Sequence, residues 1–536
     1  MARTLPVLAT VAFLSIPASA FAEPVDLEMV TRIREEGFRH SQVLETARHL
    51  TDVIGSRLTG SPGMKAANDW TRQRLEEWGL EKAHLEDYPF GRGWSFSRAA
   101  VHMTKPQQGP LHALPRAYTP GTAGPVRGTT LIAKFEKESD FDAWRGKLAG
   151  KVVLFEDPFD FANPDEVDPR EYTAEKLLEL GRFEIPPDRD RAELKKRGVE
   201  RAKFRDALNR FLAEEKTLAV INVSNRPWGV VRVTRGGSFE PGLSVGVPTV
   251  VMAAEHYNRL HRLISAGTEV ELEVEVEARY HDEDEMAYNT IAEIPGTDRK
   301  GEIVMVGAHL DSWHGSTGAT DNAAGCAVVM EAVRILKAIG VKPRRTIRIA
   351  LWSGEEQGLM GSVDYVAEHF AAWSGPEDPE EKKWIRRDNW RGEGKLALRP
   401  GHEKLSAYFN MDNGAGRIRG IYAEGNAAVR PIFESWLAPF HDIGADTVTL
   451  RATGGTDHEA FLDVGLPGFQ FVQDRLDYSA RTHHSNLDAF DHLDRDALVQ
   501  ASVVVASFLY NAATRPEKLP RPPLPVTIPA PNPSTP

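Results

Sequence analysis

A buried strand followed directly by a short loop and a helix is the feature that most limits the fold of this chain. The unbroken apolar run 303–308 predicts the strand, and the apolar residues of 323–336 predict the helix, which Thr320 or Asp321 would cap. His309 and Asp321 lie on the loop between them, at the carboxyl end of the strand, where open α/β sheets place their ligands. On its own, this pair is also what an ordinary strand–loop–helix connection contains.

The same alternation of strand and helix continues after Tyr288. Apolar runs predict strands at 289–294, 303–308, 346–352, 405–411 and 468–472, and helices at 323–339, 359–370, 428–440 and 495–513. This pattern predicts an α/β fold with a mixed, largely parallel central sheet and helices on both faces.

The length of 536 residues favours at least two domains. Short β-type runs with turn signals, from 130–134 to 270–276, predict a separate β-rich domain inserted into the main one. We therefore expect a signal peptide (1–22), the first part of the main domain (23–114), the inserted domain (115–280), the rest of the main domain (281–515) and a proline-rich tail (516–536). We also expect a helical segment at 27–50 interrupted at Gly37, a linker at 109–128, and a poorly ordered tail.

The first residues have the pattern of a secretory signal: Arg3, an apolar stretch at 5–16, and the small-x-small sequence 20–22. An uncleaved anchor is the alternative. No later stretch is predicted to cross a membrane, so we expect an exported protein, periplasmic or secreted, without stable membrane insertion. The net charge of −12 disfavours a nucleic-acid partner. The single cysteine, Cys326, cannot form an internal disulfide, and we interpret it as a small buried apolar residue.

Three further predicted strands end in acidic residues or histidines. Glu355 and Glu356 follow the strand 346–352, Asp412 follows the strand 405–411, and His483 and His484 follow the strand 468–472 after a loop. Each group alone has an ordinary explanation as solvated or turn residues. Their convergence with His309 and Asp321 at one sheet edge predicts a metal centre, and a set of imidazoles and carboxylates without thiolates suits zinc or a similar divalent ion.

Several motifs around these residues resemble those of the M28 family of zinc exopeptidases, and especially its carboxypeptidase Q branch. They are His-Leu-Asp-Ser-Trp at 309–313, Gly-Ala-Thr-Asp at 318–321, the segment 342–358 with its Glu-Glu pair, and Gly-Gly-Thr-Asp-His at 454–458. The inserted domain, with Gly-Lys-Val-Val-Leu-Phe at 150–155 and Val-Pro-Thr-Val-Val-Met at 247–252, looks like the protease-associated domain of many members.

The resemblance implies a centre of two zinc ions per chain. The ligands carried over are His309 and Asp412 on one ion, Glu356 and His484 on the other, and Asp321 bridging both. We prefer His484 over its neighbour His483 because the family's ligand directly precedes a small hydroxyl residue, here Ser485, with an acid, Asp488, a few positions on.

The resemblance also implies the remaining catalytic parts. A metal-bridging water would be the nucleophile, and Glu355 would be its general base without being a ligand. Asp311 would orient the ring of His309, and Tyr478 would donate to the developing oxyanion. The free α-amino group of the substrate would be held by a zinc ion or by a nearby acid such as Asp457. Arg57, in a glycine-rich turn, could approach the pocket, but we interpret it as a surface residue.

These features predict an exopeptidase that cleaves next to the free N-terminus of short peptides, as an aminopeptidase or a dipeptidase. A single-zinc glutaminyl cyclase of the same fold is one alternative, disfavoured because His309 and Asp412 are both retained; a non-catalytic binding protein is the other. The expected partner is a peptide substrate, and the sequence allows a homodimer. The charged inserts 157–215 and 374–403 depart from a minimal family member and would cover the cleft or form a subunit contact.

Overall fold

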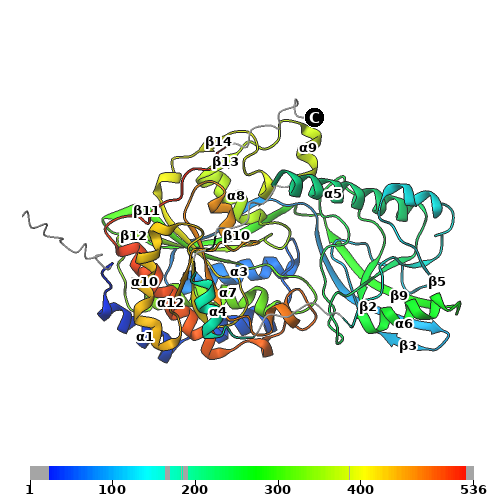
Figure 1. Cartoon of the computed structure of the whole chain (residues 1–536), viewed down its shortest axis with the longest axis horizontal. Coiled ribbons are helices and arrows are strands. Elements are labelled where there is room, and N and C mark those ends of the chain that lie inside the picture. Colours follow the sequence, from blue (N-terminus) through cyan, green and yellow to red (C-terminus); the bar gives the residue numbers. More distant parts are fainter. Residues whose placement is uncertain (1–22, 163–169, 183, 185–190, 386, 527–536) are drawn as a thin grey trace, which may run out of the picture.

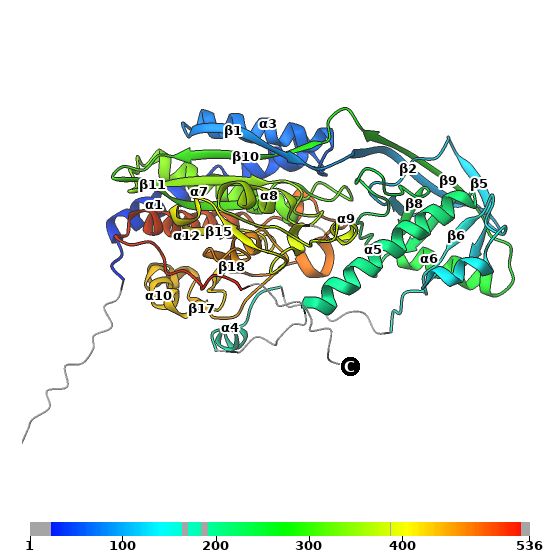
Figure 2. The same ribbon diagram turned by 90° about the horizontal axis from the view of Figure 1, so that it is seen from above.

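The computed structural model describes residues 23–162, 170–182, 184, 191–385 and 387–526, so the predicted signal peptide lies outside the described residues. The chain forms two lobes side by side, each with its own sheet (Figure 1). Seen from above, the molecule is elongated, and helix α5 (Arg191–Glu214) runs along the second lobe toward the first (Figure 2).

The first lobe is built on an eight-stranded sheet. In spatial order its strands are β1 (Glu81–Pro89), β10 (Met286–Ile294), β12 (Arg345–Trp352), β11 (Arg299–His309), β15 (Leu405–Asn410), β18 (Gly468–Gln473), β16 (Ile418–Tyr422) and β17 (Thr447–Thr449). The four central strands, β12, β11, β15 and β18, are parallel. Strands β1 and β10 are antiparallel to their neighbours, and β16 is antiparallel to β18 but parallel to β17. The predicted mixed, largely parallel sheet is confirmed. β1, β16 and β17 were not predicted, because they are short or, like β1, largely polar edge strands.

Helices cover both faces of this sheet. Along β11, Val304 and Val306 pack with α7 (Ala324–Ala338) and α12 (Arg495–Thr514), whereas Ile303 and Met305 pack with α8 (Met360–His369) and α11 (His458–Leu462). Successive side chains of a strand point to opposite faces, so β11 is buried on both sides, as the continuous apolar run predicted.

Two local predictions about the helices need correction. The first helix, α1 (Leu27–His40), continues through Gly37 and ends three residues later. A Cβ at Gly37 would lie 2.3 Å from a methyl carbon of Val503 on α12, so the glycine serves a close helix contact. The second prediction was that no stretch after the first residues could cross a membrane. Helix α12 is in fact long and apolar enough to do so, but 89% of its most apolar window is buried inside the protein, as in a core helix.

The second lobe contains the other eight-stranded sheet. Its strands, in spatial order, are β3 (Gly109–Leu111), β2 (Gly93–Lys105), β9 (Glu271–His281), β5 (Val126–Ile132), β6 (Val152–Leu154), β7 (Ala219–Val223), β8 (Thr249–Met252) and β4 (Ala113–Pro115). Helix α6 (Ala254–Ser265) packs against this sheet through Tyr257 and Leu260.

This sheet begins at Gly93, earlier than the expected boundary at residue 115, because β2 pairs along its length with β9. The segment 109–128 is therefore not a simple linker: it contains β3, β4 and the start of β5. The described part of the tail is also better ordered than expected, since Leu519 is buried and Arg521 donates to the carbonyls of His402 and Leu405.

Candidate metal centre

The register of the parallel strands brings the predicted site residues to one edge of the first sheet. His309 at the end of β11 lies opposite Trp352 at the end of β12, and Gly307 lies opposite Asn410 at the end of β15. The residues that directly follow these strands, Glu355, Glu356 and Asp412, therefore leave the sheet at the same level as His309.

One group of ligand atoms surrounds the ring of His309. Its Nε2 lies 3.3 Å from Asp321 Oδ1 and 3.3 Å from Asp412 Oδ1. On the other side of the ring, Nδ1 lies 3.0 Å from the carbonyl oxygen of Asp311, which favours a proton on Nδ1 and a free Nε2. The ring is almost completely buried.

A second group surrounds His484, which has a left-handed backbone (φ 62°). Its Nε2 lies 3.0 Å from Glu356 Oε2 and 3.3 Å from Asp321 Oδ2. His483 Nε2 is 3.9 Å from the same Asp321 oxygen, and no close contact of His483 with Glu356 is found among the described residues. The geometry therefore favours His484 over His483, and the two oxygens of Asp321 face the two groups.

These atoms fit a divalent metal centre. Asp321 Oδ2 and Glu356 Oε1 are buried and accept no hydrogen bond from the residues that the structure describes. Ligand atoms of His309, Asp321 and Asp412 all lie within 4.8 Å of one another. Buried carboxylates without hydrogen-bond donors are costly unless a cation compensates them, and imidazole with carboxylate is a donor set that zinc accepts.

The loop that carries Asp321 is held in place by hydrogen bonds to the carboxylate of Asp488. The Asp488 carboxylate accepts hydrogen bonds from the Thr320 amide (2.7 Å), the Thr320 hydroxyl (2.7 Å) and the Asp321 amide (3.1 Å). Neither Thr320 nor Asp321 caps helix α7, because both side chains have other contacts. Instead the Asn322 side chain accepts a hydrogen bond from the amide of Gly325 (3.0 Å).

Asp311 joins the His309 loop to the Glu355–Glu356 loop. Its carboxylate accepts the hydroxyl of Thr59 (3.0 Å) and lies 3.3 Å from the amide nitrogens of both Glu355 and Glu356. Its Oδ1 is 3.6 Å from His309 Nδ1, so the ring is oriented chiefly by the Asp311 carbonyl, and the carboxylate holds the neighbouring loop.

Glu355 is buried beside the two ligand groups. Burial raises its pKa well above the ordinary value, the nearby Asp412 and Glu356 add to the rise, and His309 opposes it. A carboxyl group in such surroundings accepts and releases a proton more readily near neutral pH than an exposed one.

Tyr478 lies at the same site, with its ring 4.9 Å from that of His483 between centroids. Burial, together with Asp321, Asp412 and Glu356, raises the pKa of Tyr478 well above its usual value, so the phenol remains a hydrogen-bond donor.

Asp457 is also close to the site, but it has no exposed surface. Burial raises its pKa to about 7, and the charge of His309 and the Ser362 hydroxyl oppose the rise. The structure therefore does not support direct contact of Asp457 with a substrate amine, because the carboxyl group is enclosed by protein.

The structure adds functional residues that were missed in the sequence. Arg57 is fully buried, and its guanidinium and Nε donate to the carbonyls of Leu50, Gly55, Leu310, Thr317 and Gly318 at 2.7 to 3.2 Å. The interpretation of Arg57 as a surface residue was wrong, since it fixes the loop between His309 and Asp321. Nothing in the local sequence indicates this, apart from its glycine-rich turn.

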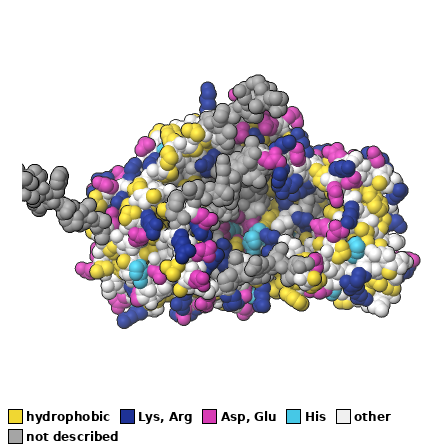
Figure 3. Space-filling model, in the orientation of Figure 1, with side chains coloured by type: hydrophobic (Ala, Val, Ile, Leu, Met, Phe, Trp, Pro, Cys, Tyr) yellow, Lys and Arg dark blue, Asp and Glu magenta, His cyan; other side chains and the backbone are white. Residues whose placement is uncertain are grey.

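Arg232 of the second lobe also reaches the site. Its Nη2 lies 3.4 Å from His483 Nδ1 and 3.3 Å from His484 Nδ1. No motif near residue 232 indicates this contact, which depends on how the two lobes pack. In Figure 3 a histidine patch lies near the middle of the displayed face, between the two lobes.

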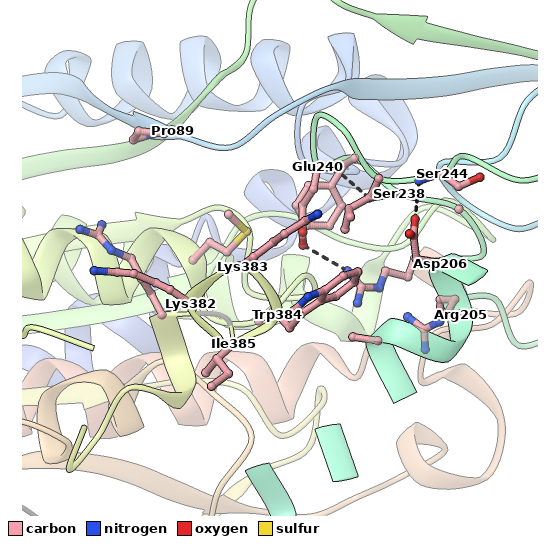
Figure 4. Close-up of a pocket in the computed structure, with 18 of the residues that line it drawn as sticks. Pro89, Arg205, Asp206, Ser238, Glu240, Ser244, Lys382, Lys383, Trp384 and Ile385 are labelled. Atoms are coloured by element: carbon pink, nitrogen blue, oxygen red, sulfur yellow. Dashed lines mark hydrogen bonds and ion pairs between the residues drawn. The ribbon is translucent and has the colours of Figure 1, made fainter. Parts of the chain in front are cut away.

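A cavity of about 490 Å³ lies beside the Glu355–Glu356 loop, and Gly358 and Met360 form part of its wall. Figure 4 shows much of the remaining lining, which includes Pro89 of β1, residues of α5, the loop around Ser238 and Glu240, and the segment 382–385. Parts of both charged inserts therefore form one cleft next to the candidate centre.

Comparison with known proteins defines the class. Residues 289–509 match the family described as Peptidase family M28, and this segment contains all five candidate ligands and Glu355. This part of the chain is therefore similar to the peptidases of family M28.

Individual relatives extend the similarity over both lobes. The chain is 26% identical over 474 residues to Carboxypeptidase Q of Bos taurus, covering 88% of this chain and 85% of the relative. A structure titled Peptidase M28 precursor, from Shewanella amazonensis SB2B, is similar in fold with a TM-score of 0.64 and 23% identity, over 93% of this chain and 98% of the other. A zinc aminopeptidase from Bacillus subtilis has a TM-score of 0.55 and 19% identity, over 88% and 94% of the two chains.

Proposed function

We propose that this protein is an exopeptidase with two zinc ions per chain that cleaves short peptides next to their free N-terminus. The observation that carries the proposal is the convergence of five ligand side chains, with the non-ligand Glu355, at the carboxyl edge of one sheet. The similarity to Carboxypeptidase Q over most of both chains supports a peptide substrate.

His309 and Asp412 would hold one ion, Glu356 and His484 the other, and Asp321 both. Zinc bound there would supply a Lewis acid for the scissile carbonyl and would lower the pKa of bound water to roughly 7.

Glu355 would take the proton of the attacking water and return it to the leaving amine, as a general base and then a general acid. The position of Glu355, buried beside the proposed ligand side chains, suits both steps. Tyr478, protonated and facing the ligand carboxylates, would donate a hydrogen bond to the developing oxyanion.

We also propose that the chain is exported by residues 1–22 and acts in the periplasm or outside the cell. The second lobe would then be the protease-associated domain of the secreted enzyme. Terminal sequencing of mature protein recovered from the periplasm or medium tests this, and a start at Met1 would overturn cleavage of a signal.

The test of the function compares wild type with Glu355→Gln. Zinc-loaded wild type should contain two zinc ions per chain and hydrolyse both a free dipeptide and an aminoacyl-arylamide. Glu355→Gln should retain both ions while its turnover falls by roughly 10²- to 10⁴-fold.

Full activity of Glu355→Gln would contradict its role as the base. One zinc ion and no peptide hydrolysis would instead favour the single-zinc cyclase, and dipeptide cleavage without arylamide cleavage would narrow the activity to a dipeptidase.

A further inference from the structure

A short antiparallel contact between the two lobes places Arg232 beside the candidate metal centre. The Val231 amide donates to the Asn486 side chain (2.7 Å), the Asn486 amide donates to the Val231 carbonyl (3.0 Å), and the Val233 amide donates to the His484 carbonyl (2.8 Å). This contact pairs Arg232 with Ser485. The loop that carries His484 is thus joined to the second lobe by main-chain hydrogen bonds.

The alternation of an extended segment directs the Arg232 side chain toward the site. Val231 and Val233 are fully buried in an apolar cluster with Trp313 and Tyr118. Neighbouring side chains of an extended segment point in opposite directions, so Arg232 points away from this cluster and toward His483 and His484.

The guanidinium of Arg232 lacks a suitable partner at this place. No ion pair with a carboxylate is found for it among the described residues, and its Nε is buried without a hydrogen-bond acceptor.

The Nδ1 of His484 does not supply the missing acceptor in a functioning site, which leaves the Nδ1 of His483, 3.4 Å from Nη2, as the other contact of the guanidinium. His484 directs Nε2 toward Glu356 and Asp321, so a metal bound there leaves the proton on Nδ1. Nδ1 then becomes a donor that faces another donor, the Nη2 of Arg232 3.3 Å away. A half-buried guanidinium in this position calls for an anion from outside the protein.

The proposed function supplies such an anion close by. In a dipeptide the free carboxylate lies one residue, roughly 3.5 Å, beyond the scissile carbonyl carbon. A positive charge next to His484 attracts this carboxylate and repels the free α-amino group, which orients the dipeptide across the centre. In a longer or amidated peptide the same position carries a neutral amide.

We propose that Arg232 binds the free carboxylate of the residue that follows the scissile bond, and so makes the enzyme select dipeptides over longer or C-terminally blocked peptides. This inference rests on the proposed exopeptidase function and assigns its specificity to a residue of the inserted domain. Arg232 thereby acts on the substrate and has no role in holding the metal.

The experiment measures kcat/KM of the zinc-loaded full chain for alanyl-alanine and for alanyl-alanine amide. Wild type should prefer the free dipeptide, and Arg232→Met should lower kcat/KM for it by roughly 10- to 100-fold, the range of a hydrogen bond to a charged group. The same variant should change the value for the amide by less than about 3-fold. Arg232→Lys, which keeps the charge but loses the planar fork, should fall between.

Arg226→Met is the matched control, because Arg226 lies in the same loop and contributes to the same field but donates to the Ser479 carbonyl. It should affect both substrates equally. Binding of N-acetylalanine and of its amide, followed by NMR titration, provides a readout without turnover: wild type, Arg226→Met and Arg232→Lys should prefer the acid, and Arg232→Met should not.

Equal losses for both substrates in Arg232→Met, or an unchanged acid preference in the binding titration, would overturn the inference while leaving the exopeptidase function intact. Cleavage of neither substrate by zinc-loaded wild type would overturn the function, and with it the inference. Zinc content and thermal unfolding of each variant distinguish these results from misfolding.

Discussion

The candidate metal centre has two halves: His309 with Asp412, and His484 with Glu356, with Asp321 facing both. The rings of His309 and His484 occupy corresponding places but are held in different ways. The His309 ring is buried in the first lobe, and its Nδ1 is fixed by a carbonyl 3.0 Å away on its own loop. The His484 side chain is 16% exposed, and its Nδ1 faces Arg232 of the second lobe. One half is therefore completed within a single lobe, and the other depends on the contact between lobes.

Under the proposed function, this difference would separate binding of the metal from recognition of the substrate. The His309 half is supported by Arg57 and Asp311, which lie in the same lobe and have no exposed surface. The His484 half is more open and has a cation from the inserted domain at its border. Under the proposed function, a change in the second lobe would therefore alter specificity without disturbing the buried half.

The largest effect is expected for Asp321, because its two oxygens face both halves. Asp321→Ala should lose zinc from both halves and reduce hydrolysis by at least roughly 10³-fold, as measured by metal analysis and by kcat/KM. Asp69→Ala, which removes an exposed carboxylate of α3 (Pro62–Glu77), is the control. Normal zinc content in Asp321→Ala would refute the bridging role.

Arg57 tests the buried half alone. Arg57→Met leaves several buried carbonyls without donors and should lower the free energy of unfolding of the metal-free protein by about 3 kcal/mol or more, measured by urea denaturation. Arg48→Met, at an exposed arginine of α2 (Val43–Arg48), should change it by less than about 0.5 kcal/mol. Equal effects of the two variants would show that the buried arginine does not support this half.

Asn486 tests the half that depends on the lobe contact. Asn486→Ala removes the acceptor of the Val231 amide and should weaken zinc binding at the His484 half by about 10-fold, with the His309 half unchanged. Two-step chelator competition measures both affinities. Asn258→Ala, which breaks a similar amide contact with Phe159 inside the second lobe, should alter neither. A weaker His309 half in Asn486→Ala would remove the distinction between the halves.

The smallest effect is expected at a buried histidine outside both halves. Burial lowers the pKa of His458, but Glu424 at 3.5 Å raises it by more, so the net shift is upward. Burial also raises the pKa of Glu424, so both groups favour proton binding in the folded state. The stability contributed by protonated His458 is complete below about pH 6.5 and is lost as the pH rises through its folded-state pKa.

Wild type should therefore lose more stability than His458→Gln as the pH rises above about 6.5, by at most about 1.4 kcal/mol per pH unit. Urea denaturation of metal-free protein across this pH range measures the difference. The exposed His102 provides the control variant His102→Gln, which should retain the wild-type slope. A slope that does not differ between wild type and His458→Gln would show that the pair does not titrate in this range.

The sequence alone determined the central sheet and the place of the candidate centre. Apolar runs such as 303–308 are long enough to identify buried strands without tertiary information, and parallel strands carry the residues that follow them to one edge. His309, Glu355, Glu356 and Asp412 were therefore brought together by local pattern and strand order. The burial of Cys326 was also confirmed, because it lies within an apolar helix.

Only the tertiary structure decided the features that depend on segments far apart in the chain. The distances to Glu356 and Asp321 agree with the preference for His484 over His483 that the resemblance had implied. The burial of Arg57 was not implied by the sequence, since it comes from carbonyls of separate segments, such as those of Leu50 and Thr317. The place of Arg232 beside the candidate centre comes from pairing between the two lobes, which brings it to His483, 251 residues away in the sequence. Local periodicity records which face of a strand or helix is buried, but it does not record which distant backbone will provide the partner.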